Sequence, residues 1–276
     1  MHSPDSGERP SADAPSHSRR GSLHGRWRLA DRQESRPYHG KPGLAQGRRV
    51  SGPFGPDVQR SGGGGVTRYR ALKILAARLT DELCIVSLGG IVNEWYNARP
   101  GPKGANLYLM ALGCHMPLAF GVALGLPHRK VLCLDTDGSV LMNLGILATL
   151  ANKQPKNLGV FVFDNEMYEC NGGQPSHTSG VADLAGMARG VGIPEARTVR
   201  TEGEMREAVE EVLSVDRLHF IVAKIEPGTE TGLPLKMTDG IEDKYLFVRH
   251  VETLEGITLI RPLTGEPGQP PRGGKP

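Results

Sequence analysis

Three short runs of this chain are apolar at every position, and segments with helical spacing stand between them. The runs cover residues 84–86, 131–134 and 159–163. A strand that is apolar at every position is buried on both faces, which is typical of a parallel sheet covered by helices. The pattern therefore predicts an α/β fold: a single doubly wound parallel sheet flanked by helices, with ligand sites at the carboxyl ends of the strands.

The spacing of apolar residues between these runs predicts the covering helices. We expect helices over residues 67–79, 117–126, 140–151, 181–190 and 204–213, and a further strand over 220–225. Residues 244–248 could form one more strand or belong to an arm.

Composition separates a leader from the part of the chain that can fold. Residues 1–65 contain 28 Gly, Pro or Ser against 13 apolar residues, and 11 Lys or Arg against 6 Asp or Glu. We expect a disordered leader over 1–65 (or an upstream stretch that is not translated), an α/β domain over 66–226, and a C-terminal arm and disordered end over 227–276. The whole chain has a net charge of +3, so residues 66–276 carry −2, which argues against nucleic-acid binding.

Deleting residues 1–64 is expected to leave the melting temperature and the activity nearly unchanged. The leader has too few apolar residues to offset the entropy of ordering its backbone. Thermal unfolding and an activity assay of the truncated chain test this expectation. A large loss of either would mean that the leader folds onto the core or onto a partner.

Neither a membrane span nor a secretory signal is recognisable. No run approaches the roughly 18 consecutive apolar residues that cross a bilayer, and no apolar stretch follows a basic start of the chain. Cys84, Cys114, Cys133 and Cys170 form no CxxC pair. They fit free thiols in a reducing cytoplasm better than disulfides or a zinc site.

Polar residues directly follow two of the expected strands. Asp137 stands in LDTDGS, after residues 131–134, and Asn165 stands in FVFDNE, after residues 159–163. Taken singly, the first sequence is typical of a turn and helix N-cap, and the second of a loop opening. Because one helix joins the two strands, we expect them to be neighbours. Asp137 and Asn165 then project into the same crevice.

One carboxylate and one amide oxygen at such a crevice suit Mg²⁺ with a bound phosphate. Magnesium is held by six oxygens, shared among carboxylates, neutral oxygens, water and substrate phosphates. Gly138 would let the backbone approach the phosphates, and the amides of Ser139 and Val140 open a helix whose N-terminus favours an anion. The sequence has neither GxGxxG after its first strand nor GxxxxGK[ST], so this is not the dinucleotide or P-loop pattern.

Together these motifs resemble those of a known family. Asp-Gly-Ser followed by Asn165 resembles the thiamine-diphosphate signature written GDG…NN. Residues 139–178 closely resemble the β subunits of sulfopyruvate decarboxylase and the related phosphonopyruvate decarboxylases. The similarity covers roughly residues 67–255, including GIEDKYLFVRH, and does not cover the leader.

The resemblance implies a site for thiamine diphosphate and Mg²⁺. The carboxylate of Asp137, the side chain of Asn165 and the carbonyl of Met167 would bind the metal. Gly89 and Gly90 would lie in a second diphosphate loop. Leu112 matches a residue that wedges the cofactor into a bent form, with plain core packing as the alternative. The cofactor-binding residues implied are Gly89, Gly90, Leu112, Gly138, Ser139, Asn165 and Met167.

Three further positions leave a role open or depart from the family pattern. His177, in GGQPSHT, could be a catalytic residue that transfers protons at the substrate, or an ordinary loop histidine. Thr136 replaces the first Gly of the signature, so a Cβ must be fitted there. Asp164 replaces the first Asn, a position that need not bind the metal.

The resemblance also implies that this chain is half of an active site. Family members convert a 2-oxoacid to an aldehyde and CO₂, and a Glu on a separate pyrimidine-binding domain activates the cofactor. Residues 66–276 hold one α/β unit, so we expect a pyrimidine-binding α subunit on a separate chain and a small 2-oxoacid of the sulfopyruvate or phosphonopyruvate type. Two alternatives stay open: a carboligating subunit like that of acetolactate synthase, and a non-catalytic scaffold subunit.

Overall fold

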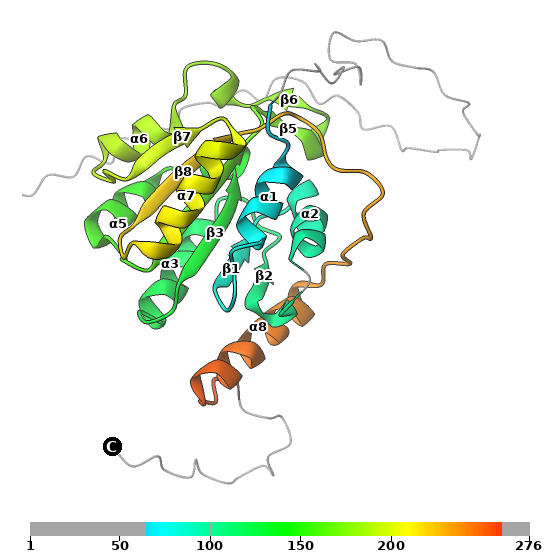
Figure 1. Cartoon of the computed structure of the whole chain (residues 1–276), viewed down its shortest axis with the longest axis vertical. Coiled ribbons are helices and arrows are strands. Elements are labelled where there is room, and N and C mark those ends of the chain that lie inside the picture. Colours follow the sequence, from blue (N-terminus) through cyan, green and yellow to red (C-terminus); the bar gives the residue numbers. More distant parts are fainter. Residues whose placement is uncertain (1–64, 100, 261–276) are drawn as a thin grey trace, which may run out of the picture. The chain divides into compact units, whose positions relative to one another are not determined.

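Six parallel strands form one sheet in the computed structural model, which describes residues 65–99 and 101–260 (Figure 1). The spatial order is β2-β1-β3-β4-β8-β7, and every pairing in it is parallel. The predicted doubly wound sheet is therefore confirmed. Its strands are β1 (Leu83–Val86), β2 (Asn106–Tyr108), β3 (Val131–Thr136), β4 (Leu158–Asp164), β7 (Ala196–Val199) and β8 (His219–Lys224).

The winding of the sheet changes direction beside β1. The chain passes from β1 to β2 at one edge and then returns to β3 on the other side of β1. In open α/β sheets, ligands bind outside the carboxyl ends of the strands at such a point. The fold thus indicates where a site should lie before any side chain is considered.

Helices cover both faces of the sheet. Two separate cores of buried apolar side chains show which helices belong to each face. One face carries α1 (Arg68–Ala76), α2 (Gly90–Ala98) and α7 (Glu202–Ser214), and Figure 1 shows α1 beside α7 there. The other face carries α3 (His115–Gly125), α5 (Gly145–Lys153), α6 (Leu184–Gly190) and α8 (Gly240–Glu255).

The central strands are apolar throughout because successive side chains enter different cores. In β4, Val160 packs in the core beneath α3 and α5, whereas Phe161 packs in the core beneath α1 and α7. Both side chains are fully buried. The period of two along a strand explains why both must be apolar.

Two expectations about the elements are wrong. The single helix expected over 140–151 is two helices, α4 (Asp137–Leu141) and α5, which are separated by a turn. In this turn the side-chain amide of Asn143 donates to the carbonyl of Gly113. The strand considered at 244–248 is instead part of α8, which Asp239 caps by accepting from the amides of Ile241 and Glu242.

The loop after β4 folds back on itself. It contains a small antiparallel pair, β5 (Met167–Tyr168) and β6 (Gln174–Pro175), and the single turns η2 (Glu169–Asn171) and η3 (His177–Ser179). α8 packs elsewhere, against β2 and the turn η1 (Lys103–Ala105). Cys84 and Cys133 lie buried in β1 and β3, as predicted, while Cys114 and Cys170 are exposed free thiols.

No helix among residues 65–99 and 101–260 combines the length and the apolar character needed to cross a membrane. Residues 1–64 of the leader expected over 1–65, and residues 261–276 of the C-terminal segment expected over 227–276, lie outside the described residues. The division of the folded part at residue 226 stays a prediction from the sequence.

Candidate active site

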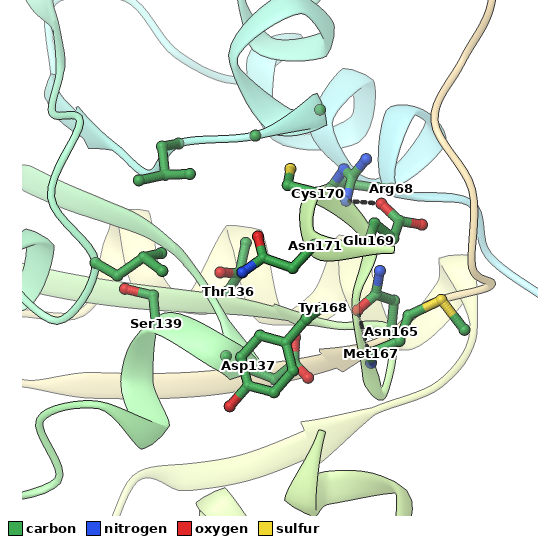
Figure 2. Close-up of a pocket in the computed structure, with 15 residues that line it drawn as sticks. Arg68, Thr136, Asp137, Ser139, Asn165, Met167, Tyr168, Glu169, Cys170 and Asn171 are labelled. Atoms are coloured by element: carbon green, nitrogen blue, oxygen red, sulfur yellow. Dashed lines mark hydrogen bonds and ion pairs between the residues drawn. The ribbon is translucent and has the colours of Figure 1, made fainter. Parts of the chain in front are cut away.

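A pocket lies at the carboxyl ends of β1, β3 and β4, where the winding changes (Figure 2). Its empty space, including the open mouth, is about 480 Å³. Five separate segments of the chain contribute to its wall. Eight residues named from the sequence line it: Gly89, Gly90, Leu112, Asp137, Gly138, Ser139, Asn165 and Met167.

The parallel register of the sheet brings the two main segments together. Thr136 at the end of β3 is paired with Phe163 near the end of β4. Asp137 and Asn165 follow these two strands directly, so they emerge at the same edge. The expectation that the strands are neighbours is confirmed.

Asp137 is buried against two hydroxyls from the loop after β6. Its side chain is 1% exposed. Its Oδ2 accepts from Ser176 Oγ at 2.5 Å, and Thr178 Oγ1 lies 3.2 Å away. Burial raises the pKa of Asp137 to about 6, with a contribution from the charge of Asp164, although the hydrogen bonds oppose this. A cation bound here would favour the ionised carboxylate.

Asn165 and Met167 are held in a compact turn. The side-chain Oδ1 of Asn165 accepts from the amide of Met167 at 3.2 Å. Glu166, between them, has a φ of 64°, which is rare for a residue with a side chain. Lys224 at the end of β8 binds Glu166 at 2.7 Å and buried Asp164 at 2.8 Å. Backbone strain of this kind is stable only when its surroundings fix it.

Asp164 thus has a partner within the protein. One oxygen pairs with Lys224, and the other accepts from Thr178 Oγ1 at 2.7 Å and from the amide of Glu166 at 3.1 Å. These contacts tie the end of β4 to β8 and to the loop that holds Asp137. These contacts explain, without a bound metal, why Asp164 can stand where the signature has Asn.

Glycine is required at two points of the wall because the backbone is approached closely. A Cβ at Gly138 would lie 2.4 Å from the ring of Tyr168, which packs beside Asp137 (Figure 2). Gly89 has a φ of 101°, and a Cβ there would lie 2.9 Å from Cys170 Sγ. Both positions are in the loops expected to approach the diphosphate.

Gly138→Ala is expected to lower the free energy of unfolding by about 1–3 kcal/mol, because Tyr168 must move or the turn must distort. Chemical denaturation measures this change. Gly121→Ala in α3 is the matched control, since a Cβ there meets nothing within 4 Å. The control should be neutral or stabilising by up to about 1 kcal/mol. Equal stability of both variants would contradict the close contact.

Ser139 joins two parts of the pocket. Its Oγ accepts from the amide of Gly113 at 3.0 Å and lies 3.0 Å from Nδ1 of His115. His115 Nε2 donates to the carbonyl of Leu109, and Nδ1 lies 3.1 Å from Asp135. Burial alone lowers the pKa of His115, but the hydrogen bond and charge of Asp135 raise it overall. Because the Ser139 hydroxyl is engaged, its backbone amide is the group that suits a phosphate.

His177 does not line the pocket. It is exposed on η3, while its neighbours Ser176 and Thr178 point inward to Asp137. Sequence reasoning chose the GGQPSHT loop for its histidine and missed these two hydroxyls. A role for His177 at the substrate stays a prediction.

Other pocket residues were also missed, chiefly Arg68, Tyr168 and Glu169. Arg68 opens α1, far from the strand ends in sequence, and no motif marks it. The signal for Tyr168 was its place one residue after Met167 in the same loop. Its contact with Gly138 could not be read from spacing.

The donor set fits Mg²⁺ carrying a diphosphate. Among the described residues no three His, Cys, Asp or Glu side chains gather to hold a metal. The expected set is of another kind, with one carboxylate, one amide oxygen and one backbone carbonyl, and Mg²⁺ accepts such oxygens together with water and phosphates. Gly138 has no side chain of its own to cover the backbone that would face the diphosphate, and the ring of Tyr168 packs against it.

Comparisons with known proteins agree with this fold. The profile described as thiamine pyrophosphate enzyme, C-terminal TPP binding domain, matches residues 91–223. Sulfopyruvate decarboxylase subunit beta of Methanococcus maripaludis is 34% identical over 188 residues, which are 68% of this chain and 98% of that protein. Phosphonopyruvate decarboxylase of Streptomyces viridochromogenes is 32% identical over 69% of this chain and 51% of that protein.

A solved structure shares the fold. Benzoylformate decarboxylase of Polynucleobacter necessarius superposes with a TM-score of 0.51 at 21% identity, over 69% of this chain and 36% of that one. The fold and the pocket define an α/β domain with a pocket at the point where the winding of its parallel sheet changes. The chain belongs to the thiamine pyrophosphate enzyme family.

Proposed function

We propose that this chain is the diphosphate-binding subunit of a thiamine-diphosphate- and Mg²⁺-dependent 2-oxoacid decarboxylase. The observation that carries the proposal is the convergence of four segments, chosen from the sequence, on one pocket at the switch point of the sheet. The similarity to a sulfopyruvate decarboxylase β subunit, which covers 98% of that protein, supports the decarboxylase class.

In this proposal the pocket residues expected from the sequence hold the metal and the cofactor. Asp137, Asn165 and the carbonyl of Met167 hold Mg²⁺, and the backbone at Gly89–Gly90 and Gly138–Ser139 binds the diphosphate. Leu112, in the pocket wall, would pack against the cofactor. Ser176 donates to one oxygen of Asp137, and the other oxygen would face the metal. When bound, the cofactor supplies the electron sink that lets a 2-oxoacid lose CO₂ and yield an aldehyde.

The substrate is proposed from the relatives. Their names place a sulfonate or a phosphonate on the third carbon of a 2-oxoacid. Arg68, the cationic residue in the pocket wall, is already paired with Glu94 and Glu169. We therefore assign recognition of the anionic group to the partner subunit.

A separate pyrimidine-binding partner is supported by the surface of α3. This helix carries no Asp, Glu, Lys or Arg and is apolar on all sides, which is typical of a buried helix. Leu124 is nevertheless 52% exposed, and Met110 and Met142, beside the pocket segments, are also exposed. A partner covering these side chains would complete the pocket, in keeping with the "subunit beta" in the relatives' names.

His177→Ala is expected to lower turnover about 10²–10⁴-fold at saturating substrate, as for a residue that transfers protons. The position supports this role, because His177 is exposed beside the hydroxyls that hold Asp137. Cofactor binding should not change, since His177 lies outside the pocket wall. Steady-state kinetics of the assembled enzyme measure the effect, and normal turnover would make it an ordinary loop histidine.

A calorimetric titration of the full chain with thiamine diphosphate tests the proposed cofactor. Heat of binding is expected with Mg²⁺ present and should disappear with EDTA. Binding of equal strength in EDTA would contradict the metal assignment. Analysis of the reaction products then separates an aldehyde from a carboligation product.

A further inference from the structure

A buried arginine that has no role in the proposed mechanism lies in the wall of the pocket. Arg68 is 3% exposed. Its Nε donates to Glu94 at 2.5 Å, its Nη1 to Glu169 at 3.2 Å and its Nη2 to Thr229 at 3.0 Å. Figure 2 shows the pair of Arg68 and Glu169 at one side of the pocket. We call these four residues the arginine cluster.

Both carboxylates of the arginine cluster also bind the segment that follows β8. Glu94 Oε1 accepts from the amide of Glu230 at 2.8 Å, and Glu169 Oε1 accepts from the amide of Gly228. Each carboxylate therefore gives one oxygen to Arg68 and the other to this segment. Buried charges persist when they are paired and fully hydrogen-bonded, as they are here.

The arginine cluster touches both walls of the pocket. A Cβ at Gly90 would lie 2.5 Å from Arg68 Nη2, so the guanidinium packs directly against the Gly89–Gly90 loop. Glu169 follows Met167 on the loop that also carries Asn165. The ion pair between Arg68 and Glu169 therefore links the diphosphate loop to the metal-binding loop.

We propose that Arg68 is a positioning residue, which through Glu169 fixes the loop of Asn165 and Met167 relative to the Gly89–Gly90 loop before the cofactor binds. This inference rests on the proposed function. Removal of a residue that contacts a metal ligand and orients it typically lowers metal affinity about 10–100-fold.

Direct binding of the diphosphate by Arg68 is the competing role, and the charges argue against it. The guanidinium faces two carboxylates, so the cluster has a formal charge of −1 and does not attract an anion. The two roles predict opposite changes in binding when the charge of Glu169 is removed. Removing the charge of Glu169 frees Arg68 for an anion in the competing role, but loosens the metal-binding loop in ours.

Glu169→Gln in the full chain tests whether binding weakens or strengthens when this charge is removed. We expect Mg²⁺ affinity, measured by calorimetry at saturating thiamine diphosphate, to fall about tenfold or more. Hydrogen exchange of the amides in residues 165–171 should become faster. Arg68→Lys, which keeps the charge but loses the planar fork, should act in the same direction. Glu210→Gln is the matched control, because it breaks the exposed pair with Arg78 away from the pocket.

The outcomes separate this inference from the proposed function. Tighter binding in Glu169→Gln, or unchanged affinity and exchange, would overturn the positioning role while Asp137→Ala still abolishes binding. Wild-type Mg²⁺-dependent binding in Asp137→Ala would instead overturn the proposed function. If Arg68→Lys does not fold, Glu169→Gln decides, since Glu169 is partly exposed.

Discussion

Asp137→Ala is expected to abolish Mg²⁺-dependent binding of thiamine diphosphate. Asp137 is the one carboxylate among the three proposed metal ligands. Removal of a residue that only orients a metal ligand lowers metal affinity by up to about 100-fold, so removal of Asp137 should lower it further. The diphosphate would lose the cation that links it to the protein. Asn165→Ala should weaken binding strongly by the same reasoning.

The melting temperature of the chain, with and without the cofactor, provides a second measurement. A ligand at about 100 times its Kd stabilises a protein by about 2.7 kcal/mol, so the cofactor with Mg²⁺ should raise the Tm of the wild type. In Asp137→Ala this rise should vanish while the ligand-free Tm changes little, because burial already disfavours the ionised carboxylate. Asp216→Ala, at an exposed position, is the control. An undiminished rise in Asp137→Ala would contradict the metal assignment.

The metal and diphosphate residues could be predicted from the sequence because they follow directly from the strands. A run that is apolar at every position marks a buried parallel strand, and the residue after it must lie at the ligand-binding edge. Asp137 stands three positions after one such run, which ends at residue 134, and Asn165 two positions after another, which ends at residue 163. The register of β3 with β4 then leaves little freedom in how far apart they lie.

The supporting residues could not be predicted, because their contacts depend on loops that close far along the chain. Arg68 reaches Glu169 across 101 positions, and Ser176 reaches Asp137 across 39. No periodicity encodes these pairs. They become visible only when the loop after β4 folds back over the strand ends.

Short edge strands and the last helix were missed for a different reason. β2 and β7 lie at the edges of the sheet, and the middle residues of β7 are partly exposed, so neither needs a continuous apolar run. The helix α8 did carry signals. Asp239 is a good N-cap, and Gly256 ends the helix with a φ of 65°.

The isolated chain is expected to be nearly inactive as a decarboxylase and to gain activity with a pyrimidine-binding partner. The pocket segments of the described residues supply groups for the metal and the diphosphate. The carboxylate that activates the cofactor is proposed to come from the other subunit. Loss of such an acid–base group typically costs about 10²–10⁴-fold in rate, so the chain alone should work at no more than about a hundredth of the rate of the complex.

The exposed apolar side chains of α3 and its surroundings offer a structural check on this partner. Leu124→Asp should weaken assembly with the partner and reduce activity in proportion, while the isolated chain stays folded, because Leu124 is exposed there. Analytical ultracentrifugation with and without the partner measures assembly. Full assembly of Leu124→Asp would place the interface elsewhere.

The most direct test of the half-site account is CO₂ release from a panel of 2-oxoacids by the purified chain, with thiamine diphosphate and Mg²⁺, before and after addition of the partner. Mass spectrometry must first show that the chain is free of any partner. We expect CO₂ release near background for the chain alone and at ordinary enzyme rates for the complex. Ordinary rates from the isolated chain would contradict the half-site account.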